Sequence, residues 1–223
     1  MPIVSTTKDC TALSDAELAE MADLGADREQ GFDIGFLSKE REEWVLVTQA
    51  REGKKLRGYS YCSLERIGGT PCLLIGVASV DRTTRAEAAL KSILADQYRR
   101  ALLAFPDEDV LLGTRLFSAD GYRVFSGLLD IVPLPGHKAT GEERAWGRRL
   151  AKRFRCERRL DDRAFILRGD GSVAGGLDFV AAKLKLPERV EELFGDVDAA
   201  AGDRLVVFGW AMAEDLAKGK LGR

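Results

Sequence analysis

The stretch that decides the fold is PCLLIGVASVDRTTRAEAALKSIL, residues 71–94. Its first ten residues, 71–80, are almost wholly apolar, which is typical of a central strand that is buried on both faces. After Asp81 the apolar residues change to helical spacing, and this pattern continues to Phe105, where Pro106 stops it. The stretch therefore predicts a buried strand followed directly by the longest helix of the chain.

Upstream of this stretch, the sequence predicts a short strand, a helix and then a β-hairpin. Ser14 and Glu17 form a capping box, which indicates where the helix begins. Residues 25–39 are ambiguous, with a second short helix as one interpretation. The predicted strands before the central one are residues 3–7, 44–50 and 56–66, the last two alternating with period two around a turn at 53–55.

Downstream of the long helix, the pattern is shorter and more broken. Pro133 and Gly136 bound the clearest interruption in the chain, and Thr140 caps a second strong helix over residues 142–155. Further predicted strands are residues 110–116, 121–129, 164–168 and 205–210, and further short helical pieces are 179–184, 189–194 and 214–218.

Composition excludes several classes of protein. The 223 residues carry 34 basic and 36 acidic side chains, a net charge of -2, so no bulk charge points to nucleic acid as a partner. The longest apolar stretches, 71–80 and 205–213, are about half the roughly 20 residues that cross a bilayer. Residues 1–10 lack the pattern of a secretory signal. We expect a cytoplasmic protein without a membrane partner.

Cysteine and histidine usage limits the chemistry further. The four cysteines stand singly, without the close spacing of metal or redox motifs, and are expected to be reduced and mostly buried. His137 is the only histidine, so a site with several imidazole ligands is excluded. It is either a surface residue or a base near neutral pH. The adjacent Asp161 and Asp162 are expected to point apart, which makes a poor metal site.

The order of elements, with a helix crossing over after an antiparallel meander, resembles the GNAT superfamily of N-acyltransferases. The strongest match is Val80-Asp81-Arg82-Thr83-Thr84-Arg85-Ala86-Glu87-Ala88-Ala89-Leu90, set against the family pattern of a strand ending in Val-Asp and a helix opening with Arg-x-x-Gly-x-Gly/Ala. Ala88 and Leu90 stand at the two glycine positions, so the motif is degenerate. The resemblance implies an α/β fold with a mixed, mostly antiparallel sheet flanked by helices. Residues 1–135 would form the GNAT-like acyl-CoA-binding core. Residues 136–223 would be a C-terminal elaboration, either part of the same fold or a small appended α/β subdomain.

The resemblance also implies a cofactor site. Amide groups at a helix start favour a pyrophosphate, and a basic residue there is unfavourable unless an anion is present. The co-substrate would be acetyl-CoA or another acyl-CoA, and this prediction depends on an open groove where the central strand meets the long helix. The implied binding residues are Ser79, Val80, Arg85, Ala86, Glu87, Ala88, Ala89 and Leu90.

The implied reaction is direct acyl transfer, with acetyl as the expected group, to the amine of a small molecule or a protein. By resemblance, Glu65 takes the place of a meander carboxylate and Tyr122 that of a phenol near the leaving thiolate. Tyr59 and Tyr61 share a strand face with Glu65 and could line an acceptor cleft or merely cover a helix. The sequence leaves open whether the chain forms a homodimer.

Two alternatives to catalysis remain. One is a catalytically inactive GNAT-like binding or regulatory protein, which Leu90 supports. The other is a polyanion-binding module that uses the basic region from Arg144 to Arg163, in which Arg148, Lys152, Arg155 and Arg159 fall on one helical stripe. The same stripe is also compatible with a solvated helix face.

Overall fold

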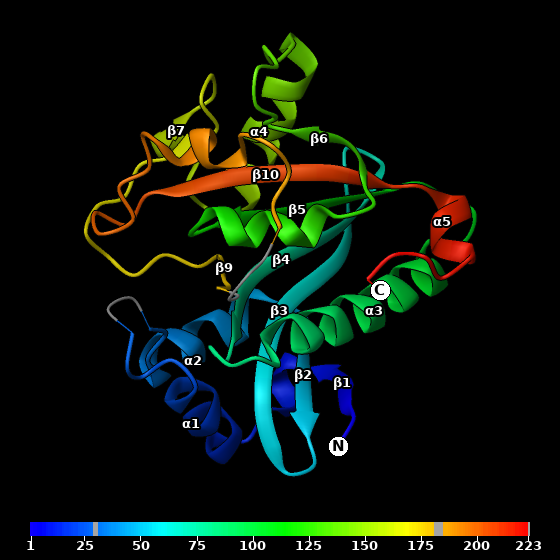
Figure 1. The fold of residues 1–223 in the computed structure, drawn as a ribbon, viewed down its shortest axis with the longest axis vertical. Coiled ribbons are helices and arrows are strands. Elements are labelled where there is room, and N and C mark those ends of the chain that lie inside the picture. Colours follow the sequence, from blue (N-terminus) through cyan, green and yellow to red (C-terminus); the bar gives the residue numbers. More distant parts are fainter. Residues whose placement is uncertain (29–30, 181–184, 223) are drawn as a thin grey trace.

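The computed structural model describes residues 1–28, 31–180 and 185–222, and it places one large sheet at the centre of the molecule (Figure 1). Ten strands join this sheet in the order β1-β2-β3-β4-β9-β5-β10-β8-β7, and β6 pairs with β10. The strands are β1 (Ile3–Asp9), β2 (Leu46–Glu52), β3 (Lys55–Ile67), β4 (Thr70–Val80), β5 (Val110–Leu116), β6 (Leu129–Val132), β7 (Leu160–Asp161), β8 (Ile166–Leu167), β9 (Leu177–Asp178) and β10 (Arg204–Ala211).

The pairing is mostly antiparallel. Parallel pairing joins β4 to β5, β4 to β9 and β5 to β9. The predicted mixed, mostly antiparallel sheet is therefore confirmed. Strand β10 lies between β5 and β8, so strands from both sides of residue 136 share this sheet. The division at residue 135 into a core and an elaboration stays a prediction.

Helices cover both faces of the sheet. The α-helices are α1 (Asp15–Asp23), α2 (Ile34–Glu43), α3 (Ala86–Ala104), α4 (Gly141–Arg153) and α5 (Ala213–Ala217), and the 3-10 helices are η1 (Cys10–Ala12), η2 (Ala119–Phe125), η3 (Glu157–Arg159) and η4 (Val190–Phe194). No helix in the described ranges is long and apolar enough to cross a bilayer.

The alternation of side chains along β1 shows which helix covers which face of the sheet. Thr7 donates a hydrogen bond to Asp96 of α3, whereas the neighbouring Lys8 donates to Glu17 of α1 at 2.7 Å. Because successive side chains of a strand point to opposite faces, α3 and α1 lie on opposite sides of the sheet. The predicted apolar stripe of α3 packs against β1 to β4, and its one amide, Gln97, donates to Ser60 Oγ at 2.9 Å.

One element differs from the sequence expectation. Residues 121–129 were expected as a strand, but 119–125 form η2 and the strand β6 begins only at Leu129. The buried rings of Tyr122 and Phe125 lie three residues apart, which suits a 3-10 helix because its side chains at i and i+3 share one face. The helical piece predicted for 179–184 lies largely outside the described residues, and the ambiguous region 25–39 contains α2.

A β-bulge interrupts β4 at Gly76. Tyr61 pairs with Val77 and Cys62 with Ile75, so Gly76 has no opposite residue in β3. The indole ring of Trp44 lies against Gly76, and a Cβ at this position would stand 1.8 Å from the ring. The central strand therefore needs a glycine here for close approach.

We expect Gly76→Ala to lower the free energy of unfolding by about 3 kcal/mol, because the added methyl group overpacks a buried contact. The matched control is Gly141→Ala at the start of α4, where a Cβ would meet nothing within 4 Å. Urea denaturation of both variants measures the effect. Equal stability of the two variants would contradict the role of the Trp44 contact.

Candidate functional site

The candidate site lies where the parallel strands β4 and β5 part. They pair directly at Cys72 to Leu74 and Leu111 to Gly113, near the start of both strands. Helix α3 is the crossover between them. In α/β sheets, ligands bind in the crevice outside the carboxyl ends of such parallel strands. The ends of β4 and β5 are therefore the place where the fold would put a ligand, and they meet the start of α3, as the sequence predicted.

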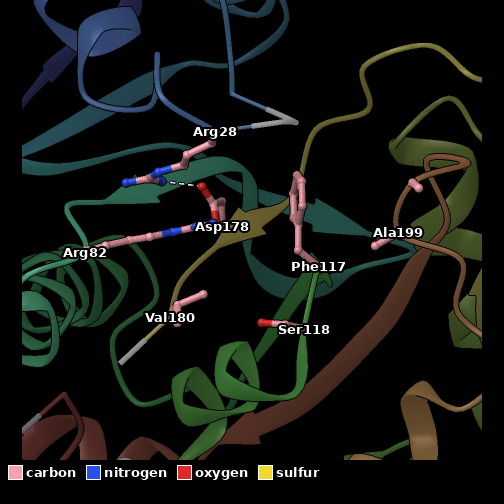
Figure 2. Close-up of a pocket in the computed structure, with 8 residues that line it drawn as sticks. Arg28, Arg82, Phe117, Ser118, Asp178, Val180 and Ala199 are labelled. Carbon is pink, nitrogen blue, oxygen red and sulfur yellow. Dashed lines mark hydrogen bonds and ion pairs between the residues drawn. The ribbon is translucent and has the colours of Figure 1, made fainter. Parts of the chain in front are cut away.

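This crevice is filled by the protein's own strand β9. Ala78 of β4 donates its N–H to Gly176 O at 2.9 Å, and the N–H of Phe117, just after β5, donates to Leu177 O at 3.4 Å. The side chains of Leu177 and Phe179 are fully buried. Segment 176–179 thus accepts hydrogen bonds from the ends of both strands and fills the apolar space between them. Figure 2 shows the strand of this segment, which carries Asp178.

Two adjacent glycines let the chain enter this narrow space. A Cβ on Gly175 would stand 2.5 Å from Arg115 Nη2, and a Cβ on Gly176, at φ +150°, would stand 2.7 Å from Arg115 O. Arg115 itself is buried, donates to Gly76 O at 2.9 Å and lies over the Phe154 ring. The Gly175-Gly176 pair before an apolar residue was the sequence signal for this close approach, and sequence reasoning missed it.

Arg28, from the loop after α1, fastens β9 to β4. It forms an ion pair with Asp178 and donates hydrogen bonds to Ser79 Oγ and Val80 O, each at 2.7 Å. The side chains of Arg28 and Asp178 are only 4% and 8% exposed. Arg82 contacts the other carboxylate oxygen of Asp178 at 3.6 Å (Figure 2). Sequence analysis identified neither Arg28 nor Asp178, because they lie 150 positions apart in segments without regular pattern.

Small openings remain on either side of the Arg28–Asp178 pair. One cavity of about 270 Å³ is lined by residues that include Arg82, Ser118 and Val180. Another, of about 480 Å³, is lined by residues that include Asp27, Lys55 and Asp81. Arg28 and Arg82 line both cavities.

The predicted cofactor residues of the strand end and helix cap have partners within the chain. Arg28 donates hydrogen bonds to the Ser79 hydroxyl and the Val80 carbonyl. Arg85 is turned toward the N-terminus, where it donates to Met1 O at 2.9 Å and pairs with Glu52 at 3.4 Å. The anion that the sequence led us to expect beside Arg85 is therefore a carboxylate of this chain.

The first turn of α3 faces mainly inward. Ala86, Ala89 and Leu90 are buried in the core, whereas Ala88 is exposed. Glu87 pairs with Arg123 at 2.9 Å and with Lys91. Leu90 is therefore part of the core, and β9 occupies the space between the ends of β4 and β5. The cofactor-binding role of these residues stays a prediction.

The two predicted catalytic residues do not meet at the crevice. The buried Tyr122 donates to Pro133 O at 2.9 Å, and burial raises the pKa of its phenol. Glu65 accepts from Arg153 Nε at 2.7 Å and lies opposite Cys72. From Cys72 to Val80, β4 extends about 26 Å at about 3.3 Å per residue. Their catalytic roles stay predictions, as does an acceptor cleft at Tyr59 and Tyr61, both of which are buried.

Three of the four cations in the basic stripe of α4 form ion pairs with carboxylates of this chain. Arg148 pairs with Asp162, Arg155 with Glu43 and Arg159 with Asp170. The opposite side of the helix packs inward through Trp146 and Leu150. Most of the charge that the sequence suggested for a polyanion is thus used to attach α4 and η3 to the rest of the molecule.

Comparisons with solved structures find similar chains at identities below 20% and TM-scores below 0.5. No family model and no curated protein matches the chain.

One similar solved chain is from the NatC complex bound to Gag peptide and CoA, with 19% identity and a TM-score of 0.41, covering 57% of this chain and 83% of that one. Aminoglycoside 6'-acetyltransferase type Ii has 10% identity and a TM-score of 0.43, covering 58% and 86%. ElaA of Escherichia coli has 16% identity and a TM-score of 0.38, covering 62% and 94%. These neighbours are GNAT acetyltransferases. At such scores the likeness assigns no activity, cofactor or residue to this chain.

We expect Asp178→Asn to lower the free energy of unfolding by about 3–5 kcal/mol, because Arg28 would stay buried without its carboxylate. The control is Glu108→Gln, which breaks the exposed Arg66–Glu108 pair, whose side chains are 45% and 41% exposed, and should cost at most about 1 kcal/mol. Chemical denaturation of both variants gives the comparison. A loss no larger for Asp178→Asn than for the control would show that the pair does not fasten β9.

Asp203 closes the long loop that carries β9. Its carboxylate accepts from the N–H groups of Gly169 at 2.7 Å and Asp198 at 3.2 Å, and from Arg168 at 2.7 Å. Burial by itself raises the pKa of the Asp203 carboxyl, but these hydrogen bonds outweigh it and hold the pKa below its ordinary value. The ionised carboxylate therefore stabilises the closed loop.

We expect this stabilisation to be complete above the unfolded-state pKa of about 3.9 and to be lost as the pH falls through the lower folded-state value. Asp203→Asn should thus lower stability at pH 7 by about 1–3 kcal/mol and lose less on acidification than the wild type. Denaturation curves between about pH 7 and pH 3 measure the difference. Parallel curves for the two proteins would contradict the assignment.

Proposed function

We propose that this chain is a GNAT-like binding or regulatory protein whose acyl-CoA crevice is closed by its own strand β9. The observation that carries the proposal is the insertion of segment 176–179 between the ends of β4 and β5. Segment 176–179 already accepts from the Ala78 and Phe117 amides, so these donors are not free for a ligand that enters between the two strand ends.

Energetics favour the closed crevice. Exposing the buried side chains of Leu177 and Phe179 costs about 1.5–3 kcal/mol each, and separating the buried Arg28–Asp178 pair adds about 3–5 kcal/mol. The total, about 6–11 kcal/mol, is of the same size as the roughly 8 kcal/mol gained by a micromolar ligand. Opening the crevice would therefore use up most or all of the binding free energy of a coenzyme of ordinary affinity.

The placement of the proton-transfer candidates points the same way. Tyr122 donates its O–H to the buried Pro133 carbonyl, and Glu65 is bound to Arg153 at the far end of β4. General acid–base catalysis requires such groups within hydrogen-bond reach of the reacting atoms. Two candidate groups that are already engaged within the protein favour a non-catalytic role.

CoA-dependent acyl transfer to an amine, with acetyl-CoA as the expected co-substrate, is the second candidate. One observation favours it: Arg28 and Arg82 converge on a single carboxylate, Asp178, beside the start of α3. If β9 withdrew, a diphosphate could replace this carboxylate between the two guanidinium groups. The acceptor would then be the amine of a small molecule or a protein, and β9 would act as a gate.

Acetyl-CoA at about 2 mM should leave the melting temperature of the wild type unchanged, because β9 occupies the crevice. Hydrogen exchange should show the Ala78 and Phe117 amides equally protected with and without acetyl-CoA. Scanning calorimetry and exchange mass spectrometry of the full chain make these measurements.

A saturable rise in melting temperature that Arg82→Gln removes and Arg148→Gln retains would overturn the binding proposal and support the gated transferase. Release of free CoA thiol in the presence of amines would then identify transfer. Arg148 is a suitable control because its partner, Asp162, lies on the separate turn after η3.

A further inference from the structure

A third cavity lies away from the crevice, at the start of α4. Its volume is about 600 Å³, and its lining comprises His137, Lys138, Ala139, Arg144 and Arg163. The first three belong to the loop before α4, Arg144 to the first turns of α4 itself, and Arg163 to the turn between β7 and β8. Cavities of about 300–1,000 Å³ are typical of small-molecule sites.

Among the described residues, the cations of this cavity have no carboxylate partner, as is also true of Arg149, Lys152 and Arg158, whereas several other arginines of the basic region have one. Farther along, Arg148, Arg155 and Arg159 each form an ion pair with a carboxylate. Within residues 1–28, 31–180 and 185–222, no ion pair joins the side chain of Lys138, Arg144 or Arg163 to a carboxylate. The Nε of Arg144 is buried and has no hydrogen-bond partner among the same residues.

The carboxylate nearest to this group is already engaged. Glu143 lies 2.9 Å from His137 Nε2, and it accepts from the Thr140 N–H at 2.6 Å in the capping box of α4. Burial raises the pKa of the Glu143 carboxyl, but the hydrogen bonds from Thr140 and His137 hold it below its ordinary value, so it is ionised at neutral pH. Asp161, on the same turn as Arg163, accepts from the Arg163 N–H at 3.0 Å. The three cations Lys138, Arg144 and Arg163 thus outnumber the two carboxylates that contact lining residues, Glu143 and Asp161, and this leaves the cavity positive.

We propose that this cavity binds a small phosphate-bearing anion. Guanidinium groups form paired hydrogen bonds with phosphate oxygens, and a partly buried arginine with an unused Nε–H is well placed to do so. The positive end of the α4 dipole adds to the attraction. Lys138, Arg144 and Arg163 line one cavity of about 600 Å³, so a compact ligand fits them better than a polynucleotide does.

This site is independent of β9, and its test is independent of the acetyl-CoA experiment. Isothermal titration calorimetry with inorganic pyrophosphate, at low ionic strength, is applied to the wild type, Arg144→Gln, Arg163→Gln and the control Arg148→Gln. We expect one saturable site, a loss of affinity of about tenfold in each of the first two variants, and a change of less than about twofold in the control. Circular dichroism melting confirms that each variant is folded.

Absence of pyrophosphate binding to the wild type would overturn the proposal. An equal loss in Arg148→Gln would also overturn it, because the charge of the whole helix would then be responsible rather than the cavity. A competition with a short single-stranded DNA adds a further outcome. If DNA binds more tightly than pyrophosphate and Arg148→Gln weakens it as much as Arg144→Gln does, α4 is a polyanion surface and the cavity proposal is wrong.

Discussion

The insertion of β9 between β4 and β5 is the constraint on which the rest of this molecule depends. Parallel strands that diverge expose backbone donors and apolar side chains, and both must find partners. Here the partner is a segment of the same chain, held at its carboxyl side by Arg28 and Asp178. The strand therefore completes the sheet and removes the ligand crevice at the same time.

The charges of the molecule follow a similar principle of internal pairing. Arg85, which the sequence suggested would await an anion, is bound to Glu52, and Arg82 contacts Asp178. Several arginines of the basic region hold α4 and η3 in place through carboxylates from other elements. The three cations around the cavity at the start of α4 gather in one place, and a cluster of like charge is unfavourable without a counter-ion.

Much of the fold was predictable because its signals are local. The hairpin of β2 and β3, the apolar strand β4 and the helix α3 each have a periodic pattern that neighbouring residues specify. The strand expected at 121–129 was wrong because the buried rings of η2 mimic a strand pattern over a short stretch. The candidate site was only half predictable. Its location at the end of β4 followed from the motif, but its occupation by β9 did not.

The sequence by itself determined the hairpin of β2 and β3, the buried strand β4 and the long helix α3 after it, since periodicity and proline positions act over a few residues. Only the tertiary structure decided that residue 178 lies between residues 28 and 82, because a contact across so many positions depends on how the whole loop closes. Two-residue strands such as β9 carry almost no pattern of their own. They form where neighbouring strands offer unsatisfied backbone groups, and this is a property of the assembled sheet rather than of the segment.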